Sequence, residues 1–133
     1  MKFSWQSHNS KEELQDLCKA LEVLIQKWNL SKRCGFSLLL TIDEWFNNLI
    51  MHTIPSAFVQ VEIELGDDEI IITVVDDCPP FDPLQLEDPN TDAPLEEREI
   101  GGLGVFLIRK RSKRFEYERR DHKNILKITL YKD

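Results

Sequence analysis

The chain has 133 residues, which is enough for one domain with a sizeable buried core. Hydrophobic residues make up 41% and charged residues 31% of it, as in ordinary globular proteins, and no apolar run approaches the roughly 18–20 residues that a membrane span needs. The net charge of −7 argues against general nucleic-acid binding, because affinity for nucleic acid comes largely from neutralised phosphates.

The first part of the chain predicts a short strand and two helices. Apolar and polar residues alternate over residues 2–7, which is typical of a strand. Ser10 stands three residues before a glutamate, the spacing of a capping box, and the apolar residues after it recur at helical intervals. These features predict an amphipathic helix over residues 11–29. A second helix is expected to start at Ser31 and to end near Thr53.

The middle of the chain predicts a β-hairpin and a long loop. From residue 57 to residue 65 the apolar period is two, and after a short turn a second, more apolar strand runs over residues 69–75. The more apolar strand is expected to lie nearer the centre of the sheet. Residues 77–100 hold five of the six prolines and many acidic residues, and they have no apolar period. A loop of this length is usually a functional lid or a disordered segment.

The last part of the chain predicts one helix and two strands. The sequence G-G-L-G at residues 101–104 leads into an apolar run, which indicates a helix to about Lys113. Strands are expected over residues 115–119 and 125–131, joined by a turn at residues 121–124. Together the elements predict a single α+β domain, a two-layer α/β sandwich whose mixed, mainly antiparallel sheet carries its helices on one face.

A polar strip runs along the second predicted helix. Glu44, Asn48 and His52 are spaced by four residues, so they share one slowly drifting side of the helix. A strip of this kind is usually a solvated face. The spacing alone therefore does not separate a structural role from a functional one.

Two further features border the long loop. Asp76 follows an apolar strand, where a carboxylate can accept a hydrogen bond from the amine of a base or can cap the turn before the prolines. Gly101, Gly102 and Gly104 expose backbone N–H groups where a helix begins, and the positive end of a helix dipole favours an anion. The same glycines also fit a hinge.

A strongly basic run occupies residues 109–114. The expected interpretation of such a run is a solvated helix face, and the alternative is a surface that binds phosphate or a partner. Direct nucleic-acid binding through this run is not expected, because the net charge opposes it and no aromatic residues are interleaved with it.

Taken in order, these features resemble the GHKL (histidine-kinase-like) ATPases, and more closely the small bacterial anti-sigma factors that are serine-protein kinases of the sporulation and stress-response type. T-I-D-E-W-F-N-N-L-I-M-H matches the E-x-x-x-N box of that family, V-V-D-D-C-P-P-F-D-P its D-x-G-x-G box, and E-I-G-G-L-G-V-F-L-I its second glycine box. The resemblance covers nearly the whole chain and implies a Bergerat-type ATP-binding fold.

The resemblance also implies roles for single residues. Asn48 would bind Mg²⁺ through its side-chain oxygen, and Glu44 would act as the general base toward the attacking hydroxyl. Asp76 would hydrogen-bond the adenine amino group. The phosphates of ATP would be cradled by Gly101, Gly102, Leu103 and Gly104, and the lid at residues 77–100 would close over them.

The function that the resemblance implies is control of transcription by partner switching. The protein would bind a sigma factor and would phosphorylate a serine or threonine on an anti-anti-sigma antagonist, with ATP and Mg²⁺ as cofactors. The family commonly forms homodimers, for which the first helix is a candidate, although that helix fits the core equally well. We expect no direct contact with nucleic acid or with a membrane.

Two replacements in the second box leave an alternative open. Cys78 and Pro80 stand where the family has glycines, and proline fixes φ and removes an N–H donor. The loop beside the adenine is therefore expected to be stiffer. The alternative function is a non-catalytic, or nucleotide-gated, partner-binding module of the same fold. Trp45 and Phe46 are bulkier than is common at their positions, and the helical wheel places them in the core.

The cysteines and the N-terminus indicate the compartment. Cys18, Cys34 and Cys78 lie far apart, and no CxxC pair occurs, which argues against a structural zinc site and favours a reducing environment. The first residues contain no apolar segment of the kind that a secretory signal needs. A cytoplasmic location is expected.

Overall fold

The computed structural model describes residues 1–52, 57–85 and 102–132, and its elements follow the order expected from the sequence. The described elements are β1 (Lys2–His8), α1 (Lys11–Lys27), α2 (Lys32–His52), β2 (Phe58–Leu65), β3 (Glu69–Asp76), the short 3-10 helix η1 (Pro83–Gln85), α3 (Gly102–Arg111), β4 (Ser112–Arg120) and β5 (Lys123–Tyr131).

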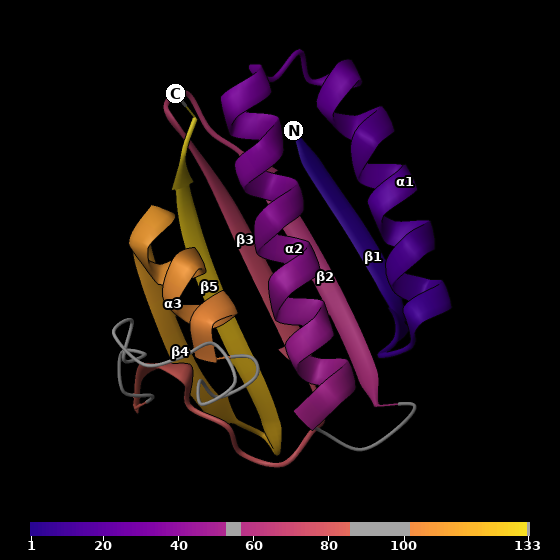
Figure 1. Ribbon diagram of the computed structural model, residues 1–133, viewed down its shortest axis with the longest axis vertical. Coiled ribbons are helices and arrows are strands. Elements are labelled where there is room, and N and C mark those ends of the chain that lie inside the picture. Colours follow the sequence, from indigo (N-terminus) through magenta and orange to yellow (C-terminus); the bar gives the residue numbers. More distant parts are fainter. Residues whose placement is uncertain (53–56, 86–101, 133) are drawn as a thin grey trace, which may run out of the picture.

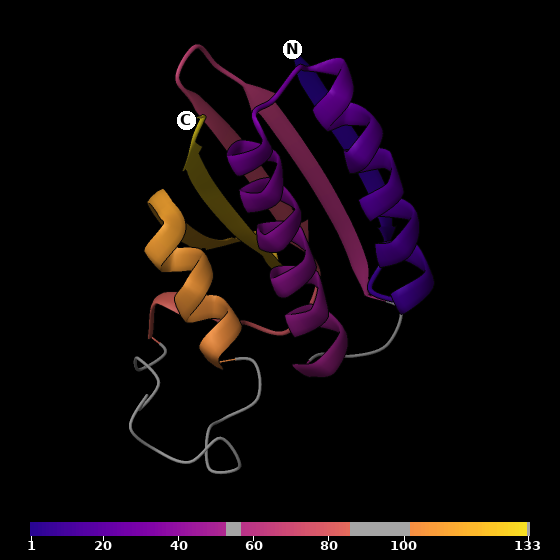
Figure 2. The same cartoon turned by 45° about the horizontal axis from the view of Figure 1, so that its top comes forward.

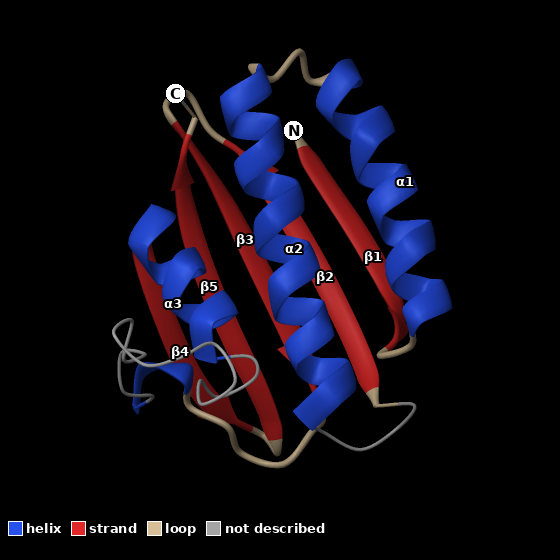
Figure 3. Cartoon of the chain, in the orientation of Figure 1, coloured by secondary structure: helices blue, strands red, loops and turns tan. Residues whose placement is uncertain are grey.

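The strands form one five-stranded sheet in the order β1-β2-β3-β5-β4 (Figure 3). All pairings between the described strands are antiparallel, so the parallel component of the expected mixed sheet is not found there. The reason is that β4 runs in the same direction as β3, but β5 lies between them. As expected, β3 is the central strand.

The helices α1, α2 and α3 cover the same face of the sheet, which confirms the two-layer sandwich (Figures 1 and 2). Alternate residues of each strand point to that face, because successive side chains of a strand alternate between its two sides. The fully buried core includes Val61 and Ile63 of β2, Ile72 of β3 and Ile128 of β5.

The helices meet this face through apolar stripes. In α1 the buried stripe is Leu14, Leu17, Leu21 and Leu24, so this side of the first helix belongs to the core rather than to a dimer contact. In α2, Trp45 and Phe46 are each 2% exposed, as the helical wheel predicted. No helix in the described part of the chain is long and apolar enough to cross a membrane.

The ends of the first two helices are set by local backbone chemistry. The Ser10 side chain accepts a hydrogen bond from the Glu13 amide, which caps the start of α1. The helix was predicted to reach residue 29 but ends at Lys27, because Asn29 adopts a left-handed conformation with φ 52°. Ser31 is the cap of α2 rather than its first residue, since its Oγ accepts from the Cys34 amide at 3.1 Å.

The C-terminal hairpin is longer than predicted at both strands. α3 stops at Arg111, and β4 begins at Ser112, where an irregular register before Arg114 lets the chain turn directly from helix to strand. The expected four-residue turn contracts to Asp121 and His122, with φ of 54° and 63°. Two positive φ values in succession are typical of a tight type I′ hairpin turn.

Candidate functional site

The predicted site residues lie at one end of the helical layer, where α2 ends, α3 begins and β3 ends (Figure 1). Glu44 and Asn48 are in the second half of α2, Gly104 is in the first turn of α3, and Asp76 is the last residue of β3. Three elements that are separate in the sequence therefore bring these residues to the same end of the molecule.

Some predicted features lie outside the described residues. They are Gly101, the part of the lid at residues 86–100, and the side chains of His52 and Leu103. The backbone of Gly102 is described, and it is the first residue of α3.

Glu44 and Gly104 bring α2 and α3 into direct contact. A Cβ atom added to Gly104 would overlap the Oε2 atom of Glu44 and would lie 3.2 Å from its Cδ. The absence of a side chain at Gly104 is therefore what lets the carboxylate lie against the first turn of α3. Backbone N–H groups in the first turn of a helix have no partner within the helix, so this carboxylate lies where an anion-binding helix start would be.

The pKa of Glu44 is raised, first because burial penalises its charged form and then because Asp43 is a negative neighbour. A raised pKa makes the ionised carboxylate a stronger proton acceptor. This environment suits a general base better than a fully solvated carboxylate would.

Asn48, one turn after Glu44, has a buried side-chain nitrogen without a hydrogen-bond partner in the described part of the chain. Its side chain is 6% exposed, and its Nδ2 atom has no hydrogen-bond partner among the described residues. Buried polar groups are nearly always paired, so an orphan of this kind needs an explanation. A polar ligand is one such explanation, because the amide can present its nitrogen to a phosphate or, after a flip, its oxygen to a cation.

Asp76 is buried and hydrogen-bonded at the end of the central strand. It is 1% exposed, and its Oδ1 accepts from the Cys78 amide at 3.0 Å and from the Asn124 side chain at 2.9 Å. Burial raises the pKa of Asp76, while hydrogen bonds from Asn124 and from the Cys78 amide and thiol act in the opposite direction. The carboxylate is thus held in a fixed orientation at the edge of the helical layer.

Asn124 is a residue of the site that sequence reasoning missed. It was assigned to a turn, but it belongs to β5 and lies opposite Asp76 on one side and Arg119 on the other. Its Oδ1 accepts from the Tyr117 hydroxyl at 2.5 Å and from Arg119 Nη1 at 3.2 Å. No local pattern marks this residue, and only the register across three strands reveals it.

The loop after β3 is held by side chains rather than by glycine geometry. Asn124 Nδ2 also donates to the Pro79 carbonyl at 3.0 Å, and its Oδ1 accepts from the Phe81 amide at 3.4 Å. Arg119 Nη1 donates to the Cys78 carbonyl at 2.8 Å. These bonds hold the loop that carries Cys78 and Pro80, whereas the greater stiffness expected from the replacement of glycine stays a prediction.

The same loop reaches α2. The rings of Trp45 and Phe81 lie 6.1 Å apart in a tilted arrangement. Because Trp45 follows Glu44 directly, this contact connects the segment after Asp76 to the helix that carries Glu44 and Asn48. The carboxylate of β3 and the polar strip of α2 are therefore parts of one packed region.

The basic run at residues 109–114 is divided between two elements and is not one solvated helix face. Residues 109–111 end α3, whereas Lys113 and Arg114 lie in β4 and pair with Glu69 at 3.1 and 3.4 Å. The guanidinium carbon of Arg111 lies 5.2 Å from the centre of the Phe36 ring. The basic residues of this run therefore have different partners: Lys113 and Arg114 pair with a carboxylate, and Arg111 packs on an aromatic ring.

The described residues fit a magnesium site that depends on a bound nucleotide. No group of three or more His, Cys, Asp or Glu side chains within residues 1–52, 57–85 and 102–132 is placed to hold a metal alone. Mg²⁺ is commonly bound by one or two protein oxygens together with substrate phosphates. Asn48, one turn after Glu44 on α2, carries a side-chain oxygen of the kind that this arrangement needs.

Comparisons with known proteins give a family match and a similar curated protein. A family model described as "Histidine kinase-like ATPase domain" matches residues 8–130. The serine/threonine-protein kinase BtrW of Bordetella bronchiseptica is 29% identical over 111 residues, which cover 81% of this chain and 77% of BtrW.

A solved structure is also similar. It contains the RsbU and RsbW domains of Rv1364c from Mycobacterium tuberculosis, with a TM-score of 0.67 and 10% sequence identity. The match covers 98% of this chain and 32% of the solved one, so the chain spans about a third of that protein. At this identity the likeness establishes the fold.

Proposed function

The chain belongs to the histidine kinase-like ATPase domain family, and we propose that it is an ATP-binding anti-sigma factor with serine/threonine kinase activity. Its substrate would be an anti-anti-sigma protein, and its second partner a sigma factor that is released when the partners switch. The relation to BtrW, which is named a serine/threonine-protein kinase, supports the kinase part of this proposal.

The proposed nucleotide lies across the end of the helical layer. Asp76 would accept a hydrogen bond from the adenine amino group, and the N–H groups at the start of α3, from Gly102 to Gly104, would bind the phosphates. Asn48 would supply the protein oxygen for Mg²⁺. The bound metal would neutralise phosphate charge during transfer.

In the proposed reaction, Glu44 accepts the proton of the attacking serine or threonine hydroxyl. The hydroxyl oxygen forms a bond to the γ-phosphorus, and the bond from that phosphorus to the bridging oxygen breaks. The electron pair of the broken bond remains on ADP. Glu44 stands one turn before Asn48, so base and metal ligand share one rigid helix.

The observation that carries the proposal is the contact between the Glu44 carboxylate and the glycine start of α3. The test is transfer of labelled γ-phosphate from Mg–ATP to candidate anti-anti-sigma domains. Glu44→Ala should lower the rate of transfer by about 10²-fold or more, as expected for loss of a general base. Glu62→Ala, which removes an exposed carboxylate from β2, is the matched control and should transfer at the wild-type rate.

Nucleotide binding is tested separately by thermal unfolding. A ligand present at 100 times its Kd stabilises the folded state by about 2.7 kcal/mol, so Mg–ATP should raise the melting temperature. Asn48→Ala should lose most of this rise. It should leave the ligand-free melting temperature nearly unchanged, because the Nδ2 atom has no partner among the described residues.

The second candidate function is a partner-binding module without catalysis. The bonds from Asn124 and Arg119 to the loop after β3 favour it, because a loop fixed in advance does not need a nucleotide to order it. A rise in melting temperature with Mg–ATP but no transfer to any antagonist would support this candidate. Transfer that is lost in Glu44→Ala would contradict it.

A further inference from the structure

A cavity of about 600 Å³ lies at the other end of α2 and α3 from the proposed nucleotide site. The residues that matter for its chemistry are Arg33, Ser37, Lys110, Arg111, Tyr131 and Lys132, and we call it the basic pocket. They come from the start of α2, the end of α3 and the end of β5. The volume is within the range of pockets that bind small molecules.

Among the residues that the structure describes, which stop at Lys132, the basic pocket is lined by four cationic side chains and by no carboxylate. Among residues 1–52, 57–85 and 102–132, none of the four forms an ion pair, although the neighbouring Lys113 and Arg114 both pair with Glu69. The chain as a whole carries a net charge of −7, so this local excess of positive charge opposes the overall balance. Such an excess attracts anions.

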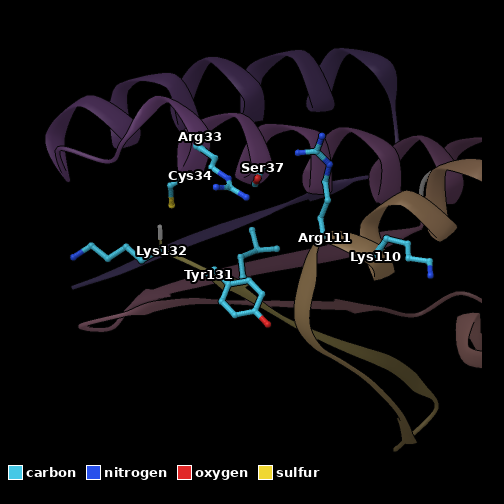
Figure 4. A pocket seen from close by; sticks show the side chains of 8 residues that line it. Arg33, Cys34, Ser37, Lys110, Arg111, Tyr131 and Lys132 are labelled. Atoms are coloured by element: carbon cyan, nitrogen blue, oxygen red, sulfur yellow. The ribbon is translucent and has the colours of Figure 1, made fainter.

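Two arginines are placed to act together. Figure 4 shows the Arg33 side chain running toward Ser37 and the Arg111 side chain reaching up toward α2, while Lys110 and Lys132 point outward at the two ends of the pocket. The packing of the Arg111 guanidinium at 5.2 Å from the Phe36 ring limits its freedom without using its N–H donors. Ser37 adds a hydroxyl one turn after Arg33.

We propose that the basic pocket binds a soluble small molecule with two or more phosphate groups. Guanidinium groups bind phosphate through paired N–H donors, and two of them on different helices match two phosphates better than one. The buried Leu130 forms part of the wall, and the Tyr131 ring, which is 56% exposed, offers a flat surface to an organic group. The hollow shape favours a small molecule over an acidic protein segment.

The test is a titration of the isotope-labelled protein with pyrophosphate in the absence of magnesium, followed by NMR. Backbone amides of Arg33, Ser37 and Arg111 should shift and saturate, and orthophosphate should bind at least tenfold more weakly because it offers one phosphate. Arg33→Gln combined with Arg111→Gln should weaken pyrophosphate binding roughly tenfold or more, as expected for the loss of charged hydrogen bonds.

Arg120→Gln is the matched control, since it removes one arginine charge at the far end of β4 and should bind like wild type. Three outcomes would overturn the proposal: no saturation, equal binding by wild type and the double variant, or shifts produced only by a glutamate-rich peptide. Shifts confined to residues 44–48 and 102–106 would place pyrophosphate in the proposed nucleotide site and would also count against the basic pocket. Because the readout is residue by residue, the result does not depend on kinase activity.

Discussion

Glu44 and Gly104 lie against each other where the two helices of the proposed nucleotide site meet, and this arrangement leads to a specific prediction. Gly104→Ala should destabilise the protein, because the new methyl group would displace the Glu44 carboxylate from its position. In a Glu44→Ala background the overlap disappears, since the remaining Cβ of residue 44 lies 3.7 Å away, an ordinary contact. There the same change should stabilise the protein by up to about 1 kcal/mol, the helix-propensity gain of alanine over glycine.

The measurement is a double-mutant cycle of unfolding free energies from urea titration. The sign of the Gly104→Ala effect should reverse between the two backgrounds. Additive effects would show that Glu44 does not occupy the space beside Gly104.

Asn124 is predicted to be the most sensitive polar residue of the sheet end. Asn124→Ala should lower the unfolding free energy by about 2–4 kcal/mol, because it removes several hydrogen bonds and leaves the buried Asp76 with fewer donors. Nucleotide binding should weaken as well. Asn47→Ala is the matched control: among the described residues its amide donates to the Asp43 carbonyl within α2 and to no other group, so the change should stay within about 0.5 kcal/mol.

At the residue scale, local patterns marked candidate positions, but the roles of these residues came from the resemblance to the GHKL family and stay a prediction. Glu44, Asn48, Asp76 and Gly104 stood out by spacing or position, and the fold brings them to one end of the molecule. Asn124 did not stand out, because its importance comes from lying beside Asp76 in the register of β3 and β5. A partner across a sheet is fixed by tertiary pairing, which no local pattern encodes.

At the scale of elements, the tight turn between β4 and β5 carries strain. Asp121 and His122 both have positive φ, a conformation that costs residues with a side chain more than it costs glycine. His122→Gly should therefore raise the unfolding free energy by up to about 1 kcal/mol. Nucleotide binding should not change, because neither turn residue is among those that bond to Asp76 or to the loop after β3 in the described structure.

Asp68→Gly is the comparison for this prediction. Asp68 lies in the turn between β2 and β3 but is not among the described residues with positive φ, so glycine there should lower stability. Thermal unfolding of both variants distinguishes relief of strain from a general effect of glycine in turns.

Element order and most element types followed from hydrophobic periodicity, whereas several boundaries did not. The end of α1 depends on the left-handed Asn29, and the direct passage from α3 to β4 depends on an irregular register near Ser112. Both boundaries depend on the local backbone conformation of one or two residues, which the packing against the sheet determines. The uniform antiparallel pairing likewise required knowing that β5 lies between β3 and β4.

At the scale of the whole molecule, Asp76 couples stability to pH. Its pKa is raised in the folded state, so on raising the pH the unfolded chain loses this proton first, near the ordinary value of about 4. The native protein should consequently lose stability as the pH rises through the window between that value and the raised one. The physical cause is that burial disfavours the charged form of Asp76 relative to the unfolded chain.

Asp76→Asn cannot titrate and should not show this loss. The difference in unfolding free energy between the variant and wild type should move in favour of the variant as the pH rises through the window, measured by denaturant titration at each pH. Asp67→Asn, at an exposed turn, should not reproduce the change. A constant difference for Asp76→Asn would contradict the raised pKa.

The bonds that hold the loop after β3 have a consequence for protein engineering. The loop and the side chains that fix it, Arg119 and Asn124, are some 40 residues apart in the chain. Suppose that a chimera received only this loop in a version with the glycines of the family box. That loop would then face Arg119 and Asn124, whose side chains are placed to bond to the present, glycine-free loop. The transferable module is the loop together with the β4–β5 hairpin, and grafts designed on that unit should keep the nucleotide end intact.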